Sequence, residues 1–405
     1  MQYVIFDDPV IRPSLLPLTY TRPVSGVRVG ILTLHEKWER HLGEACGHLT
    51  QPYLQKLYPF TLAAEALACF LNGAVCAHPS LLQALGSLAP HEALVQEGVV
   101  LAAHGTRAQV EALLRGDRQG WTVRTHVPPV TVIRKVWHIF QRNGDEIAAD
   151  FALLTAGRRS APIADPHTIV YHPDQVFLEP GVQIKAAILN AEPGPIYLGR
   201  DAQIHEGAII RGPFAMGEGA AVSFAAKIRG GTTVGPYCKA GGEINNSVLF
   251  ANSNKSHDGF IGNTVLGEWC NLGADTNTSN LKNNYGNVKV WSYPDERFED
   301  AGLQFCGLIM GDHSKAGINT MFNTGTVVGI GANIFGAGYP GKFVPSFSWA
   351  NPEGPGTGFS LYRLDKFLDM VEHVMGRRHQ PLDDPTRAML KNVYSQTTRY
   401  RQYFD

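Results

Sequence analysis

Residues 198–234 read LGRDAQIHEGAIIRGPFAMGEGAAVSFAAKIRGGTTV, and an aliphatic residue stands at every sixth position of this stretch. The recurring residues are Leu198, Ile204, Ile210, Met216, Val222, Ile228 and Val234. An amphipathic helix repeats every three to four residues and a strand every two, so neither explains the pattern. A period of six fits a hexapeptide repeat, in which each short strand sends one side chain inward and three strands close a triangular coil. Such coils stack about 4.8 Å apart, the usual spacing of strands.

Shorter runs of the same period flank this stretch. They comprise Val176, Val182 and Ile188 upstream, and Leu266 with Leu272 and Ile318 with Ile330 downstream. Such aliphatic residues fill about a quarter of a typical chain, so seven consecutive matches are not expected by chance. Gly follows the aliphatic residue at positions 199, 217 and 235, which suits a place beside a tight turn. The pattern predicts a left-handed parallel β-helix over residues 166–345, interrupted by polar segments at 252–259 and 275–300.

The segments on either side lack this period. Residues 1–160 predict an α/β domain. We expect its buried strands at 4–6, 74–77 and 99–103, and its helices at 62–71, at 109–114 and from about 145 to 154. Apolar residues at helical spacing predict C-terminal helices within residues 358–405, and Asp384 before Pro385 marks the expected start of the last one.

Composition narrows the function classes. A chain of 405 residues is expected to hold two or three domains. The formal net charge of −1 gives no bulk attraction to nucleic acid or to an anionic membrane. No apolar run is long enough to span a bilayer, and the first eight residues do not read as a signal peptide. The six cysteines show no Cys-x-x-Cys spacing, so we expect buried thiols in a reducing cytoplasm.

The stretch from Glu243 to Tyr285 resembles the acetyltransferase half of the bifunctional GlmU family, which joins a sugar-1-phosphate uridylyltransferase to a glucosamine-1-phosphate N-acetyltransferase. The matching phrases are Glu243, Asn254-Lys255-Ser256-His257, Ile261-Gly262, Asn271-Leu272-Gly273-Ala274 and Asn284-Tyr285-Gly286. Most of the chain is similar to the "alternative GlmU" branch of that family. The phrases that carry this wider likeness are Leu16-Pro17 to Val24, Arg28 to Thr33, Glu36-Lys37-Trp38 and the block from Gly241 to Trp349.

The resemblance implies acetyl transfer from acetyl-CoA to the 2-amino group of glucosamine 1-phosphate. His257 matches the catalytic base that takes the proton of the amine, a role that suits an imidazole. The residues implied to bind the substrate are Lys227, Glu243, Lys255, Asn271, Asn284 and Tyr285. Asn245 departs from the family, because it stands where a phosphate-binding Lys is usual, and Lys255 is a candidate to supply the missing charge.

The segment Leu16–Pro23 resembles the one that follows the Gly-rich loop of sugar-1-phosphate nucleotidylyltransferases. The Gly-rich loop itself is absent, because Phe6-Asp7-Asp8-Pro9 offers no glycines through which backbone amides could approach a triphosphate. The residues expected to bind the nucleotide are Arg22, Arg28 and Lys37, with Asp7 and Asp8 as expected ligands of the Mg²⁺ that accompanies UTP.

The leading expectation is a cytoplasmic, homotrimeric, bifunctional enzyme that makes UDP-N-acetylglucosamine from a sugar 1-phosphate, acetyl-CoA and UTP, with no nucleic acid or membrane partner. One alternative keeps the acetyltransferase and makes the N-terminal domain non-catalytic. A second is a γ-type carbonic anhydrase with His205, His257 and His313 on zinc, although the closely spaced His pair of that class is missing. A third is a purely structural β-helix, which leaves the polar loops unexplained.

Overall fold

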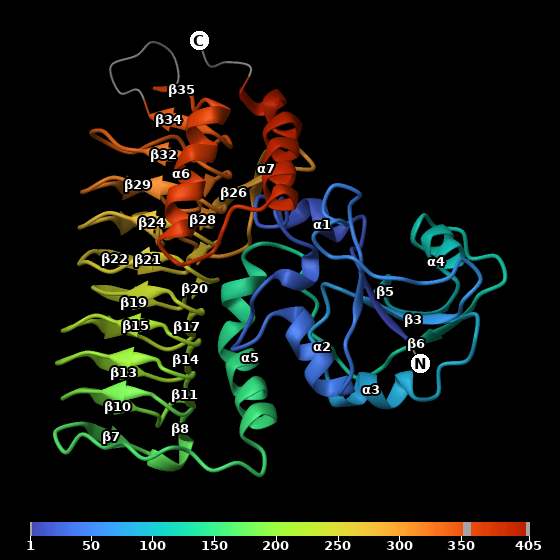
Figure 1. The fold of residues 1–405 in the computed structure, drawn as a ribbon, viewed down its shortest axis with the longest axis horizontal. Helices are drawn as coiled ribbons and strands as arrows, with labels where there is room; N and C mark the ends of the chain where they lie inside the picture. The colour runs from blue at the N-terminus through green and yellow to red at the C-terminus, as the bar shows by residue number, and fades with distance from the viewer. Residues whose placement is uncertain (1, 351–357, 402–405) are drawn as a thin grey trace. The chain divides into compact units, whose positions relative to one another are not determined.

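The computed structural model describes residues 2–350 and 358–401 and contains two compact units, shown in Figure 1. One unit comprises Met1–Val27 and Leu32–Lys135, and the other comprises Arg28–Ile31 and Val136–Asp405. The fold class predicted from the sequence is confirmed, because an α/β domain precedes a parallel β-helix and short C-terminal helices.

The first unit is built on a six-stranded mixed sheet with the order β2-β1-β3-β5-β4-β6. Its strands are β1 (Tyr3–Phe6), β2 (Gly47–Leu49), β3 (Ala68–Asn72), β4 (Glu92–Gln96), β5 (Val99–Gly105) and β6 (Thr122–Thr125). Its helices are α1 (Ile11–Ser14), the 3₁₀ turn η1 (Val24–Gly26), α2 (Leu34–Leu42), α3 (Pro79–Leu85) and α4 (Arg107–Leu114). Separate apolar clusters fill the two faces of the sheet, one reaching Trp38 of α2 and the other Val110 of α4.

The expected strands at 4–6 and 99–103 and the helix at 109–114 are confirmed, but two local predictions are wrong. Residues 62–71 form no helix, and the buried strand is β3 rather than residues 74–77. All five residues of β3 are buried, because it pairs with β1 on one side and β5 on the other in the middle of the sheet. A strand covered on both faces reads as a continuous apolar run, which periodicity does not separate from a helix.

The second unit is a β-helix whose coils each add one strand to three parallel faces. The first face holds β7 (Ile169–Tyr171), β10 (Ile188–Asn190), β13 (Ile209–Arg211), β16 (Lys227–Ile228), β19 (Glu243–Asn245) and β22 (Phe260–Gly262). The second face holds β8 (Val176–Leu178), β11 (Ile196–Leu198), β14 (Phe214–Met216), β17 (Thr232–Val234), β20 (Val248–Leu249), β23 (Val265–Leu266), β28 (Ile309–Met310), β31 (Val327–Val328) and β33 (Phe343–Val344).

The third face is the one that carries the candidate site. It holds β9 (Gln183–Ile184), β12 (Gln203–Ile204), β15 (Ala221–Val222), β18 (Lys239–Ala240), β21 (Asn254–Lys255), β24 (Asn271–Leu272), β29 (Lys315–Ala316), β32 (Asn333–Ile334), β34 (Ser348–Ala350) and the antiparallel β35 (Phe359–Leu361). In Figure 1 the strands of this unit stack as rungs from β7 to β35.

The seven repeat residues all lie in the core of the β-helix, so this prediction is confirmed; none is more than 2% exposed. Among the flanking runs, Leu266 and Leu272 lie in the core as predicted, whereas the upstream run and the pair Ile318 and Ile330 were placed in the wrong register. The inward residues are Leu178, Ile184 and Leu189 upstream, and Met310, Ala316, Phe322, Val328 and Ile334 downstream. Ile318, which was expected to point inward, is 72% exposed.

Glycine at the corners lets successive coils stack backbone on backbone. A Cβ atom on Gly235 would lie 1.6 Å from the carbonyl oxygen of Phe250 in the next coil. A Cβ on Gly217 would lie 2.4 Å from the nitrogen of Pro236. Only glycine avoids these contacts, which explains why it follows the aliphatic residue in the repeat.

Helix α5 (His138–Thr155) clusters with the β-helix rather than with residues 1–135. It packs on β14, β17 and β20, and Asn143 donates through Nδ2 to the Gly231 carbonyl at 2.8 Å. The compact units divide between residues 135 and 136, with Arg28–Ile31 also in the second unit, whereas the sequence predicted an α/β domain that runs to residue 160. The helix begins at His138, earlier than the start near residue 145 that the sequence predicted.

Two helices follow the β-helix, as predicted. Helix α6 spans Leu364–Gly376 and α7 spans Asp384–Gln396. Asp383, not Asp384, is the cap of α7, because its side chain accepts the backbone N–H of Thr386. The 3₁₀ turns η2 (Pro173–Gln175) and η3 (Thr398–Arg401) complete the unit. In the described residues, no helix has the length and apolar character needed to cross a membrane.

The two polar segments behave differently. Residues 252–259 are not an excursion, because they contain β21, which stays in register on the third face. Residues 275–300 do leave the coils: after β25 (Asn277–Thr278), which pairs with β30 (Met321–Phe322), the chain forms a hairpin of β26 (Lys289–Ser292) and β27 (Arg297–Asp300).

Candidate functional site

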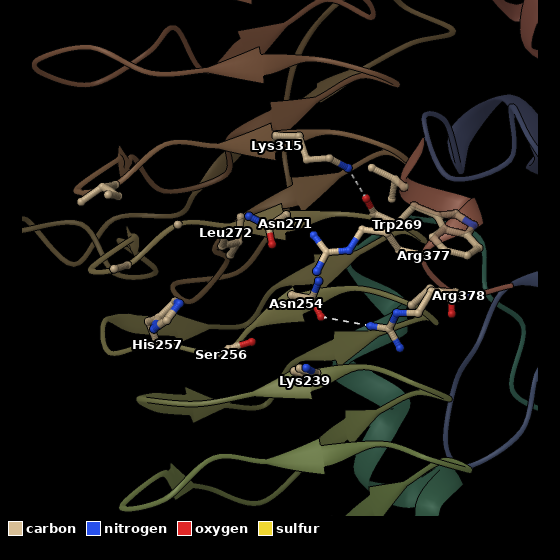
Figure 2. Close-up of a pocket in the computed structure, with 15 residues that line it drawn as sticks. Lys239, Asn254, Ser256, His257, Trp269, Asn271, Leu272, Lys315, Arg377 and Arg378 are labelled. Carbon is tan, nitrogen blue, oxygen red and sulfur yellow. Dashed lines mark hydrogen bonds between the residues drawn. The ribbon is translucent and has the colours of Figure 1, made fainter. Parts of the chain in front are cut away.

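A groove of about 880 Å³ runs along the outside of the third face. Its floor is a row of outward residues paired strand to strand: Lys239, Asn254, Asn271 and Lys315. Side chains alternate along a strand, so the residue that follows each of these points into the core. Figure 2 shows this row with the other residues that line the groove.

His257 lies at the corner between the third and first faces, in the turn that joins β21 to β22. It lines the groove and also a second hollow of about 680 Å³, shared with His205 and Phe224. The residue is exposed, and within the described chain no side chain hydrogen-bonds to its imidazole. Its ring is therefore open to a ligand in either hollow, as a general base must be.

The side of the groove away from His257 carries cations. Arg377 and Arg378 follow α6, and Figure 2 shows Arg378 across the row from His257, with Asn254 and Asn271 between them. Arg378 donates through Nη2 to Asn254 Oδ1 at 3.4 Å. No acidic side chain stands among the described residues that line the groove, so the site favours an anionic ligand.

Lys315 lies in the same row, beside Asn271. Its Nζ donates to the carbonyl of Trp269 at 2.5 Å. Burial lowers the pKa of Lys315 to about 8. In mildly alkaline solution a fraction of the molecules therefore carries Lys315 in its neutral form, so on average this residue adds less positive charge to the groove than either arginine does.

Of the residues expected to bind substrate, Asn271 lies in the groove with His257, while Lys227 and Glu243 lie on the first face. Lys227 and Glu243 are neighbours in register on β16 and β19, and Glu243 also meets Arg229 at 3.5 Å. Lys227 is exposed and Glu243 is half-buried. This pair belongs to the face on the other side of the corner that carries His257.

Asn284 and Tyr285 lie in the loop that follows β25. Asn284 lines a separate hollow of about 530 Å³, together with Lys282, Asn323 and Tyr339. Tyr285 is 66% exposed. Within one chain, then, the structure brings Asn271 and His257 together but leaves the other expected contacts on separate surfaces.

Lys255 is not where a phosphate-binding residue would be. It points into the core of the β-helix and is fully buried. Its ammonium group donates to the carbonyls of Gly241, His257 and Asp258. The expectation that Lys255 replaces the cation missing at Asn245 is therefore wrong, because its donors are directed at backbone carbonyls inside the coil.

The carboxylates expected to hold Mg²⁺ are occupied by the chain itself. Asp7 accepts from the backbone N–H of Val24 at 2.7 Å and from Thr50 Oγ1 at 2.6 Å, and burial raises its pKa. Asp8 accepts from the N–H groups at the start of α1 and from Asn72 Nδ2 at 3.1 Å. Residues 2–350 and 358–401 contain no cluster of three or more His, Cys, Asp or Glu placed for a metal.

The same finding bears on the zinc alternative, because His205, His257 and His313 do not form such a cluster in one chain. His313 is buried and stacks on Trp269, with ring centroids 6.2 Å apart. All six cysteines are free thiols, and five of them are buried. Among residues 2–350 and 358–401 of one chain, neither these histidines nor the cysteines gather into a group that could hold a metal.

The cations expected to bind the nucleotide are buried. Arg22 is 4% exposed and donates to the Leu18 carbonyl at 2.9 Å, and Lys37 of α2 is 1% exposed. Arg28, which clusters with the second unit, donates to the Ile31 carbonyl. Arg22 and Arg28 therefore bind backbone carbonyls of their own chain, and the Leu16–Pro23 segment does not present an exposed phosphate site.

The sequence did not point to Lys239, Trp269, Lys315, Arg377 or Arg378, although all five line the groove. A signal existed for two of them. Lys239 and Lys315 each precede a small inward residue of the six-residue repeat, so their outward position follows from the register. Arg377 and Arg378 follow the last turn of a helix remote in sequence, and only the tertiary structure brings them to the groove.

Comparison with known proteins gives one match by sequence. Residues 3–159 match the sugar nucleotidyl transferase family. No curated protein matches the chain. The matching segment ends before the β-helix, so this likeness concerns the N-terminal part of the chain alone.

Several solved structures are similar to the chain at low identity. UDP-N-acetylglucosamine acyltransferase from Campylobacter jejuni is 13% identical, with a TM-score of 0.28 over 58% of this chain and 82% of that one. The Arabidopsis UDP-N-acetylglucosamine acyltransferase is 13% identical, with a TM-score of 0.21 over 58% and 81%. AntD, an N-acyltransferase from Bacillus cereus in complex with dTDP and 3-hydroxybutyryl-CoA, is 11% identical, with a TM-score of 0.22 over 53% and 92%. At these values the likenesses say nothing about activity, and the relation to a known group is confined to residues 3–159, which match sugar nucleotidyl transferases.

Proposed function

We propose that the β-helix transfers an acetyl group from acetyl-CoA to the amine of glucosamine 1-phosphate. The observation that carries this proposal is the groove itself, in which an open imidazole, His257, faces a cationic side marked by Arg377 and Arg378. A long anionic thioester fits such a groove, with its phosphates beside the arginines and its acyl end toward the corner.

The chemistry needs one proton acceptor. As the amine nitrogen attacks the thioester carbonyl, a C–N bond forms and the C–S bond breaks, and the thiolate of CoA leaves. His257 takes the proton that the amine loses and then donates it to the CoA thiolate, which restores the neutral imidazole. Asn271, which lines the same groove, accepts a hydrogen bond from the amine through its side-chain oxygen in this proposal, and so directs the nitrogen lone pair.

We further propose that the active protein is a homotrimer. Lys227 with Glu243, and Asn284 with Tyr285, lie on surfaces apart from the groove of their own chain. A neighbouring copy would bring one of these surfaces against His257 and complete a sugar-phosphate site. Light scattering that finds a monomer with full acetyl transfer would overturn this assembly.

For the N-terminal unit, we propose uridylyl transfer from UTP to N-acetylglucosamine 1-phosphate, supported by the family match over residues 3–159. Asp7 and Asp8 do not fit a resident Mg²⁺, because their oxygens accept hydrogen bonds from the chain. The burial of Arg22, Arg28 and Lys37 favours a second candidate, in which this unit has no catalytic role.

The six cysteines are free thiols, which supports the proposal that the protein is cytoplasmic.

One experiment separates these candidates. The purified protein is incubated with a panel of sugar 1-phosphates, acetyl-CoA and nucleoside triphosphates with and without Mg²⁺, and the products are identified by mass. Acetylated glucosamine 1-phosphate supports the β-helix assignment, and UDP-N-acetylglucosamine supports both activities. Absence of any acetylated sugar would overturn the acetyltransferase.

A further inference from the structure

A lysine occupies a core position of the β-helix. On the third face the other inward residues are apolar or small: Ile184, Ile204, Val222, Ala240, Leu272, Ala316 and Ile334. In β21 this position belongs to Lys255, which is in register with Ala240 and is fully buried. A buried ammonium group is costly unless all its donors are paired, so its presence calls for a specific set of partners.

The partners are three backbone carbonyls at one corner. Lys255 Nζ donates to Gly241 at 3.2 Å, to Asp258 at 3.0 Å and to His257 at a shorter distance. An ammonium group has three N–H bonds, so the three carbonyls use all of them. Gly241 belongs to the coil below, whereas His257 and Asp258 form the turn above, so one side chain ties two successive corners together.

This corner has few other side chains to hold it. A Cβ atom on Gly242 would lie 2.6 Å from the carbonyl oxygen of Gly259, and one on Gly259 would lie 2.3 Å from that of Thr276. The backbones of three coils therefore stack directly at this corner. The orientation of the peptide groups at residues 257 and 258 decides where the His257 side chain points, and Lys255 binds the carbonyls of both.

We propose that Lys255 is a positioning residue, which acts from inside the β-helix to hold the turn that aims His257 into the groove. This inference rests on the proposed role of His257 as the base. Lys255 does not touch the substrate, because its side chain lies on the core side of the coil while the groove lies outside.

The proposal has a consequence for pH. Burial lowers the pKa of Lys255 to about 8, against the opposing effect of Asp258 and Asp275, the two carboxylates whose charge acts on it. A neutral amine has only two N–H bonds, so above that pH one of the three carbonyls loses its partner. We expect the kcat for acetyl transfer to fall above pH 8, because two hydrogen bonds fix the orientation of the peptide groups around His257 less firmly than three.

The test replaces Lys255 by Met, an apolar side chain of similar length that suits a core position. The control is Ile204→Met, an equivalent inward change three coils earlier on the same face. We expect Lys255→Met to lower kcat at least about 10-fold, to leave the KM for acetyl-CoA unchanged and to abolish the fall of kcat above pH 8. Wild-type kcat with a wild-type pH profile would overturn the proposal.

Hydrogen exchange separates this inference from the proposed function. Lys255→Met should speed amide exchange in residues 252–262 but not in 203–212, whether or not the wild type transfers acetyl groups. Unchanged exchange in 252–262 would overturn the positioning role, whereas faster exchange in a protein without activity would overturn the proposed function alone. If Lys255→Met does not fold, Lys255→Gln, a shorter neutral side chain that keeps two N–H donors, is measured in its place, and unchanged exchange in 252–262 would again overturn the positioning role.

Discussion

Replacement of Arg378 by Gln should weaken acetyl-CoA binding while leaving the chemical step intact. The Arg378 side chain is half-buried, and its Nη2 donates a long hydrogen bond of 3.4 Å to Asn254 Oδ1. Its other N–H groups can therefore donate to an anion in the groove. A charge-assisted hydrogen bond contributes about 1.5–3 kcal/mol when shielded from water. Because this side chain is partly exposed, the lower end applies, and about 1.4 kcal/mol corresponds to a tenfold change.

The expected result is therefore a KM for acetyl-CoA raised about 10-fold, with kcat within about twofold of wild type, as for a contact made equally in the ground and transition states. The assay is steady-state acetyl transfer to glucosamine 1-phosphate at low ionic strength. The matched control is Arg363→Gln at the other end of α6, where Arg363 is exposed and pairs with Asp365.

The acyl donor provides a second control. Acetylpantetheine lacks the nucleotide and all of its phosphates, so wild type and Arg378→Gln should use it equally. A variant that loses the same factor with acetylpantetheine as with acetyl-CoA would refute the placement of the phosphates beside Arg378. An unchanged KM for acetyl-CoA would refute it as well.

His257→Ala should lower the rate of acetyl transfer by about 10²–10⁴-fold, with unfolding free energy within about 0.5 kcal/mol of wild type, and His167→Ala, an exposed histidine remote in the sequence, should do neither. Gly235→Ala should destabilise the protein in urea by about 3 kcal/mol or more, because its Cβ would lie 1.6 Å from the Phe250 oxygen, whereas Gly376→Ala, with open space around it, should change stability little. Arg22→Ala should lower the free energy of unfolding by about 1–3 kcal/mol, since the Leu18 carbonyl loses its buried donor, and calorimetry that finds an unchanged Tm would contradict this structural role. The pKa of Lys255 is about 8 in the folded protein and near 10.5 in the unfolded chain, so between these pH values the unfolded chain binds more protons. The free energy of unfolding of the wild type should therefore rise with pH over this range relative to that of Lys255→Met. Denaturant titrations in which the difference between the two proteins does not change with pH would contradict this.

The six-residue period predicted the β-helix because one side chain per strand must fill a narrow core, and no other architecture demands that spacing. The register was predicted correctly at Leu266 and Leu272 but was missed over residues 310–334, for a physical reason. Its inward residues are six apart, but they include the small Ala316 and the aromatic Phe322, which do not read as part of an aliphatic repeat.

Less of the site was predictable. His257 and Asn271, which the resemblance assigns to one site, both line the groove, Asn271 from β24 and His257 from the turn that follows β21. The position of Lys255 was predicted wrongly because a lysine in a polar segment normally faces water, whereas here three backbone carbonyls accept hydrogen bonds from its ammonium group. Arg22 and Asp7 resemble ligand-binding residues in sequence, yet in the structure Arg22 donates to the Leu18 carbonyl and Asp7 binds the Val24 N–H, Thr50 and Arg12. Composition and spacing do not distinguish a charge that binds a ligand from one that completes the fold.

The most direct test of the central claim is a crystal structure of the protein with CoA and glucosamine 1-phosphate bound. We expect CoA along the outward row of the third face, with its phosphates beside Arg377 and Arg378 and its sulfur and the sugar amine both within reach of the His257 imidazole. CoA bound on another face, or a sulfur remote from His257, would contradict it.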